Sequence, residues 1–173
     1  VWYLSTSYII FLILTLVWHR DRLMNDKELD AKPLVSFVVP AYNEESDIKA
    51  CLESLQGVNY ENFEVLVMND GSDDDTVSEA KKVTEHDDRF TLIDNDVNRG
   101  KPAVLNQGCK RADGELVATM DADSFAEPDI LRKAVPYFYD DNVGSVTVSV
   151  EVSNKDAAWW NHLFSVEFIV GLS

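Results

Sequence analysis

The chain has 173 residues, 46% of them hydrophobic, which is enough to bury one core. It carries 15 Lys and Arg against 31 Asp and Glu, a formal net charge of −16. This acidic balance argues against a nucleic-acid partner, because a general nucleic-acid binder needs a basic face. The two cysteines match no Cys-x-x-Cys pattern, and Cys51 falls on an apolar helical stripe, so we expect it to be reduced and in the core.

The first predicted element is a membrane-spanning helix over residues 1–18. Residues 2–18 contain no charged side chain, and as a helix they would span about 25 Å of a hydrocarbon layer about 30 Å thick. Basic residues follow directly in His19-Arg20-Asp21-Arg22, which predicts that the rest of the chain faces the cytoplasm. A buried core helix and a cleaved signal peptide are the alternative interpretations. Because the chain begins with Val and ends in an apolar stretch, we expect a fragment of a longer protein.

After a polar linker over residues 19–33, apolar runs alternate with segments of helical periodicity. The predicted strands are Leu34–Val39, Phe63–Met68, Phe90–Ile93 and Leu116–Met120. Helical stripes follow them at residues 48–55, 77–83, 103–112 and 130–138. Strands without polar alternation, joined by helices, predict an α/β, doubly wound fold whose parallel sheet is covered on both faces.

Each predicted strand is followed by a polar cluster. The four clusters are Tyr42-Asn43-Glu44-Glu45, Asn69-Asp70-Gly71-Ser72-Asp73-Asp74-Asp75, Asp94-Asn95-Asp96 with Asn98-Arg99-Gly100-Lys101, and Asp121-Ala122-Asp123. In a parallel sheet the carboxyl ends of the strands share one edge, where ligands bind. The sequence therefore predicts one site built from all four clusters.

The residue types in these clusters indicate a metal and a nucleotide. Asp121 and Asp123 point the same way along an extended segment, and paired carboxylates suit Mg²⁺ or Mn²⁺. Tyr42 has a face on which a base can stack, Asp70 can accept a hydrogen bond from a base, and Lys101 or the neighbouring Arg99 can supply positive charge. Each residue also has a structural interpretation. Tyr42 could be a loop anchor, Asp70 a turn former before Gly71, and Lys101 a solvated residue at the start of a helix.

Two common nucleotide motifs are missing. No Gly-x-Gly-x-x-Gly follows the first strand, which argues against a dinucleotide-binding Rossmann domain. Gly100-Lys101 is followed by Pro102 and lacks the earlier glycine of a P-loop.

Four motifs in register resemble the inverting family 2 glycosyltransferases, which have a GT-A fold. They are Val38-Val39-Pro40-Ala41-Tyr42-Asn43-Glu44-Glu45, Asn69-Asp70-Gly71-Ser72-Asp73-Asp74, Asn98-Arg99-Gly100-Lys101 and Met120-Asp121-Ala122-Asp123. The resemblance covers residues 34–150. With a membrane helix in front, the chain is most similar to the membrane-bound polysaccharide synthases and N-acetylglucosaminyltransferase-like proteins of this family.

The resemblance implies a nucleotide-sugar donor, usually linked to UDP, and a polysaccharide or lipid-linked acceptor at the cell membrane. Residues 34–152 would be the nucleotide-sugar-binding half of the GT-A domain. The residues implied to bind the nucleotide are Pro40, Tyr42, Glu44, Asp70, Lys101 and Asp121. Asp123, with Asp121, would hold Mg²⁺ or Mn²⁺.

The acceptor half of the family pattern does not occur in the chain. The family's Glu-Asp or Asp-Asp base motif and the Gln-x-x-Arg-Trp segment of the synthases are both missing before Ser173. We therefore expect a chain truncated at its C-terminus, with its catalytic base beyond Ser173 and no turnover by this fragment alone.

Residues 153–173 predict an amphipathic, interfacial helix, because tryptophans and apolar residues recur with few charges. A core-facing helix is the alternative interpretation.

Three other functions stay open. A phosphatase of the haloacid dehalogenase type also places Asp-x-Asp after a strand, but after its first strand rather than its fourth. A dolichyl-phosphate-type sugar transferase shares the early motifs. A non-catalytic fragment that only binds a nucleotide sugar is the third.

Overall fold

The computed structural model describes residues 32–148 and 169–170. Its centre is a four-stranded parallel sheet in the order β3-β2-β1-β4. The strands are β1 (Val35–Ala41), β2 (Phe63–Asp70), β3 (Phe90–Asn95) and β4 (Leu116–Thr119). The helices are α3 (Ile48–Gln56), α4 (Thr76–Thr84), α5 (Lys101–Arg111) and α6 (Ile130–Ala134), and a 3₁₀ turn η1 (Val135–Tyr139) continues α6.

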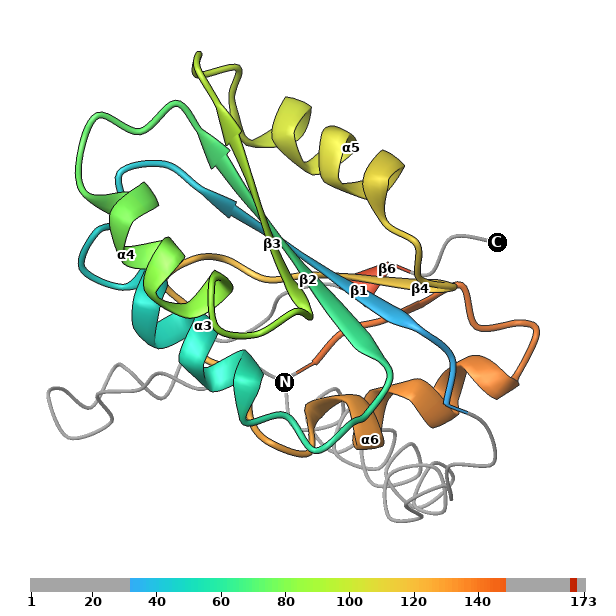
Figure 1. The fold of residues 1–173 in the computed structure, drawn as a ribbon. Coiled ribbons are helices and arrows are strands. Elements are labelled where there is room, and N and C mark those ends of the chain that lie inside the picture. Colours follow the sequence, from blue (N-terminus) through green and yellow to red (C-terminus); the bar gives the residue numbers. More distant parts are fainter. Residues whose placement is uncertain (1–31, 149–168, 171–173) are drawn as a thin grey trace, which may run out of the picture.

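Helices cover both faces of this sheet, as the sequence predicts. Alternate residues of β1 supply the two faces because successive side chains of a strand point to opposite sides. Val35, Phe37 and Val39 belong to the core under α3 and α4, whereas Val38 belongs to the core under α5. Figure 1 shows α3 and α4 together on one side of the sheet and α5 on the other.

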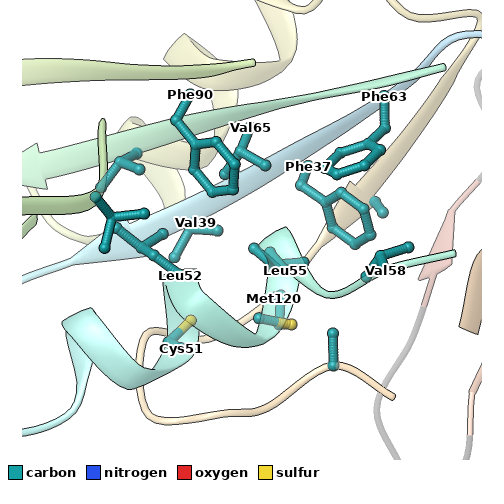
Figure 2. Packing of buried hydrophobic residues seen from close by; sticks show 14 of the residues in the cluster. Phe37, Val39, Cys51, Leu52, Leu55, Val58, Phe63, Val65, Phe90 and Met120 are labelled. Atoms are coloured by element: carbon teal, nitrogen blue, oxygen red, sulfur yellow. The ribbon is translucent and has the colours of Figure 1, made fainter. Parts of the chain in front are cut away.

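The larger core lies under α3. Cys51, Leu52 and Leu55 of this helix are fully buried against the aromatic and β-branched residues of the strands (Figure 2). Two of the strand aromatics, Phe37 and Phe63, meet edge to face with ring centroids 6.0 Å apart. Cys51 is a free, buried cysteine, which confirms its assignment to the core.

The second face depends on a close approach of α5 to the sheet. Gly108 is buried, and a Cβ added to it would lie 2.4 Å from Cγ1 of Val38. The absence of a side chain at this position therefore lets the helix backbone rest directly on β1 and β2.

The predicted helix at residues 130–138 is shorter than the sequence indicates. The α-helix ends at Ala134, and the chain continues as the 3₁₀ turn η1. The reason is Pro136, which has no N–H for the next α-helical hydrogen bond and whose ring clashes with the preceding turn.

A second, two-stranded antiparallel sheet pairs β5 (Ser145–Val146) with β6 (Ile169–Val170). The amphipathic helix predicted over residues 153–173 therefore does not cover Ile169 and Val170, whose β-branched side chains favour a strand. The rest of that segment, the predicted membrane helix at residues 1–18 and the linker up to residue 31 lie outside the described residues. Among the residues that the structure describes, no helix is long and apolar enough to cross a membrane.

Candidate functional site

The site lies where the chain reverses its winding direction across the sheet. From β1 the chain moves through α3, β2 and α4 to β3 on one side, and it then crosses back over the other face through α5 to β4. β1 and β4 are therefore neighbours at the point where this winding reverses. Such a switch point opens a crevice beyond the carboxyl ends of the two strands.

A cavity of about 160 Å³ occupies this crevice. It is lined by every residue that the sequence implies for the nucleotide and the metal, namely Pro40, Tyr42, Glu44, Asp70, Lys101, Asp121 and Asp123. The structure thus brings together residues spread over 84 positions, from the carboxyl ends of β1 and β2, the start of α5 and the loops after β1 and β4. Their gathering follows from the parallel sheet, because all four strands end at one edge.

The loop after β1, which carries Tyr42 and Glu44, is held by the loop after β2. Glu44 N–H donates to the hydroxyl of Thr76 at 2.8 Å, and Thr76 is only 1% exposed. Asn43 adopts a φ of 56° and its N–H donates to the Ser72 hydroxyl at 3.0 Å. These bonds fix the backbone of the loop and leave the Tyr42 ring 43% exposed at the mouth of the cavity.

Asp70 fixes the loop between β3 and α5. Its two carboxylate oxygens accept from the backbone N–H groups of Arg99, at 2.9 Å, and Gly100, at 2.8 Å. Asp70 is 3% exposed and still lines the cavity. Its first role is therefore structural, and a carboxylate oxygen that already accepts one hydrogen bond retains a lone pair for a ligand.

Lys101 and Asp121 form an ion pair across the cavity. The ammonium Nζ lies 2.6 Å from Oδ1 of Asp121, and the two side chains are 56% and 31% exposed. Beneath them, the Cys51 thiol donates to the backbone carbonyl of Asp121 at 3.6 Å. The Asp121 backbone thus rests on α3 while its carboxylate faces the cavity.

The cavity is strongly acidic. Burial, together with the negative charge of Asp123 and further carboxylates, raises the pKa of Glu44. Burial raises the pKa of the Cys51 thiol to about 12, with the charges of Asp123 and Asp121 adding to the effect. A site that already crowds these carboxylates favours a cation.

The donor set fits a divalent ion shared with a phosphorylated ligand. Asp121 and Asp123 supply hard oxygens in one cavity with solvent access. Within residues 32–148 and 169–170, no group of three or more His, Cys, Asp or Glu side chains forms a complete protein cage. Mg²⁺ is commonly held by one or two carboxylates plus substrate phosphates rather than by such a cage.

Not every predicted polar residue joins the site. The Asp94 carboxylate accepts from the Asn69 side chain. The Asn95 amide donates to the Asn69 backbone carbonyl and accepts from the Gln107 side chain, so the end of β3 holds β2 and α5 in place. Arg99 does not line the cavity and contributes its backbone N–H to Asp70 instead.

The sequence analysis missed several residues that build the site. Ala41, Val104 and Ala122 line the cavity, and Thr76 supports Glu44 from below. Small apolar residues carry no chemical signal in a single sequence. Thr76 carries a partial one, because a Thr after Asp74-Asp75 at a helix start is typical of a local capping arrangement.

Fold and site together define an α/β protein with an acidic cavity at a sheet switch point. The sequence profile described as Glycosyl transferase family 2 matches residues 36–169, and the chain belongs to this family. The predicted α/β fold with a parallel sheet and helices, which is GT-A-like, is confirmed.

One curated relative is the poly-beta-1,6-N-acetyl-D-glucosamine synthase of Staphylococcus aureus (strain COL). It is 33% identical over 133 residues, which is 76% of this chain and 32% of the relative. The chain therefore spans about a third of the length of such relatives.

Two solved structures share the fold and carry ligands. The mannosyltransferase PcManGT from Pyrobaculum calidifontis, in complex with GDP-Man and Mn²⁺, has a TM-score of 0.64 and 29% identity over 81% of this chain and 44% of its own. TarS 1-349 of S. aureus, in complex with UDP-GlcNAc, has a TM-score of 0.56 and 28% identity over 65% of this chain and 32% of its own.

Proposed function

We propose that the chain is the donor-binding part of a membrane-bound glycosyltransferase that transfers a sugar from a UDP-linked donor to a growing polysaccharide, with inversion. The observation that carries this proposal is the single cavity lined by Tyr42, Asp70, Lys101, Asp121 and Asp123. An aromatic ring, a cation and a pair of carboxylates at one edge match the base, the diphosphate and the metal of a nucleotide sugar.

The residues of the chain divide the donor between them. The exposed Tyr42 ring offers a face for the base, and the oxygens of Asp70 accept from the N–H groups of the base. Asp121 and Asp123 would hold Mg²⁺ or Mn²⁺, which as a Lewis acid would stabilise the negative charge of the departing diphosphate. Lys101 adds positive charge beside the same phosphates.

UDP is proposed over other nucleotides because of the relatives. The TarS structure with UDP-GlcNAc favours a uridine donor. The PcManGT structure with GDP-Man makes guanosine the competing base. The N-acetylglucosamine named in the synthase and in the TarS complex supports an activated N-acetylhexosamine as the donor sugar.

The membrane part of the proposal rests on residues 1–22. The charge-free run and the basic residues that follow it support a helix in the cell membrane, with the glycosyltransferase domain on the cytoplasmic side. A polymer acceptor, or one linked to a lipid, would approach from that membrane.

The test is a calorimetric titration of UDP into the chain with and without Mn²⁺. We expect Mn²⁺ to strengthen UDP binding by about 5- to 150-fold, the usual range for coupled ligands. Asp123→Asn should bind UDP equally with and without Mn²⁺. Asp88→Asn removes an exposed carboxylate at the opposite edge of the sheet, just before β3, and should behave like the unchanged chain.

Two results would overturn parts of the proposal. Equal UDP affinity with and without Mn²⁺ in the unchanged chain would refute the metal. Tighter binding of GDP than of UDP under the same conditions would refute uracil as the base of the donor and favour guanine.

A further inference from the structure

Lys101 brings a positive charge to a cavity that is otherwise lined by carboxylates and uncharged residues, among those that the structure describes. Of the described residues that line it, Lys101 is the one with a basic side chain, whereas Glu44, Asp70, Asp121 and Asp123 are carboxylates. Its Nζ is 2.6 Å from Oδ1 of Asp121, one of the two carboxylates that would bind the metal. The ammonium therefore occupies space beside a ligand atom that a divalent ion also needs.

Helix stability does not explain this position. Lys101 is the first residue of α5, where the positive end of the helix dipole disfavours a cation. The basic residues that the dipole favours are Lys110 and Arg111 in the last turn, and α5 has no acidic residue in its first turn. The partner that holds the Lys101 ammonium is thus Asp121, on a different loop.

We propose that Lys101 is an exchangeable counter-ion for Asp121, which makes metal binding depend on the nucleotide. In the empty cavity the ammonium neutralises Asp121 and competes with a free divalent ion. A nucleoside diphosphate offers the ammonium a new anionic partner, so Asp121 becomes available for the metal. This inference deepens the function proposed above and rests on it for the identity of the diphosphate.

The exposure of the pair makes such an exchange feasible. Lys101 is 56% exposed and Asp121 31%, so water already solvates both groups and the pair is weak. The lysine stem has four rotatable carbons and can swing its charge without moving the backbone. The backbone itself stays fixed, because Asp70 holds Gly100 directly before it.

Competition of this kind has a reciprocal consequence. An ion that binds only when the ammonium has moved away shows an apparent affinity reduced by the fraction of time that Asp121 is free. A diphosphate that draws the ammonium away raises metal affinity, and the metal raises diphosphate affinity by the same factor. Lys101 would thus discourage binding of the metal alone.

The test measures Mn²⁺ binding to the whole chain without nucleotide, from the electron paramagnetic resonance signal of free Mn²⁺. Lys101→Met keeps most of the side-chain length and removes the charge. We expect it to bind Mn²⁺ roughly two- to fivefold more tightly than the unchanged chain, as an exposed ion pair allows. Lys110→Met, an exposed lysine at the far end of α5, controls for the loss of one positive charge and should bind Mn²⁺ like the unchanged chain.

A double substitution makes the test specific to the pair. With Asp121→Asn in place, adding Lys101→Met should no longer tighten Mn²⁺ binding. Saturating UDP should raise Mn²⁺ affinity by a smaller factor in Lys101→Met than in the unchanged chain. Circular dichroism confirms that each variant is folded.

The outcomes separate the two proposals. Equal Mn²⁺ affinity for Lys101→Met and Lys110→Met would overturn the counter-ion role while leaving the proposed function standing. Failure of the unchanged chain to bind UDP with Mn²⁺ would overturn the proposed function, and the comparison without nucleotide would still decide the competition.

Discussion

The carboxylate of Asp70 and the backbone N–H of Gly100, 30 residues apart, are joined by a hydrogen bond of 2.8 Å. Gly100 has a φ of 86°, in the left-handed region that favours glycine. The end of β2 therefore sets the point at which α5 begins, and with it the position of Lys101.

Asp70→Asn should destabilise the fold and weaken nucleotide binding together. In the unchanged chain the two Asp70 oxygens accept from the N–H groups of Arg99 and Gly100. In the variant an NH₂ group would replace one of these oxygens, and one backbone N–H would lose its acceptor at a cost of about 1–3 kcal/mol. Urea unfolding would measure the loss. Asp96→Asn, an exposed carboxylate two residues before Asn98, should leave the unfolding free energy unchanged; an equal loss there would contradict the assignment.

Thr76→Val should loosen the loop that carries Glu44. The buried hydroxyl of Thr76 accepts from the Glu44 N–H and donates to Asp74, and valine would leave both without it. We expect a loss of about 1–3 kcal/mol in unfolding free energy and weaker UDP binding. Thr76→Ser keeps the hydroxyl, so it should restore most of the binding; no difference between Ser and Val would refute the role of the hydrogen bond.

Gly108→Ala should destabilise the chain although alanine favours helices. A Cβ at Gly108 would lie 2.4 Å from Cγ1 of Val38, a contact that forces α5 off the sheet. Overpacking of this kind costs about 1–3 kcal/mol, more than the gain of about 1 kcal/mol in helix propensity. Gly144→Ala is the matched control, since a Cβ there meets no atom within 4 Å. Thermal unfolding of both variants would show a drop for Gly108→Ala alone.

The contribution of Asp87 to stability should disappear in acid. Hydrogen bonds from the Arg89 side chain lower the pKa of Asp87 to about 2, from an ordinary value of 3.8. A lowered pKa in the folded state means that the stabilisation is present above pH 3.8 and is lost as the pH falls toward about 2. Asp87→Asn should therefore be less stable than the unchanged chain above pH 3.8, and the gap should close in more acidic buffer. Asp88→Asn should show no such pH-dependent gap.

The sheet could be predicted from the sequence because its strands are local apolar runs. All four predicted strands occur, and the helices between them follow from apolar stripes at helical spacing. Where the prediction was wrong, one residue overrode the periodicity: Pro136 ended the helix that the stripe continued through. The pairing of β5 with β6 could not be predicted, because it joins short segments far apart in the sequence.

The contacts within the site were harder to predict from the sequence than the place of the site in the fold. Polar residues after each strand predict a shared edge, and Tyr42, Asp70, Lys101 and Asp121 line one cavity at that edge. Which residue contacts which depends on side-chain geometry, so neither the Lys101–Asp121 pair nor the support of Glu44 by Thr76 is visible in the pattern. Ser36 illustrates the same limit at the other edge: its buried hydroxyl donates to Glu64 and accepts from the Gly114 N–H, although it sits in an apolar run.

The reversal of winding between β1 and β4 has a consequence for how this cavity can change. The hollow lies beyond the carboxyl ends of these two strands, and side chains from the segments around it line it. Replacing Tyr42 or Lys101, both well exposed, therefore changes the chemical lining of the cavity without removing a buried support from the folded chain. The shape of the cavity and the chemistry of its lining are carried by different atoms, so the lining can change through a few replacements at the rim while the sheet stays the same.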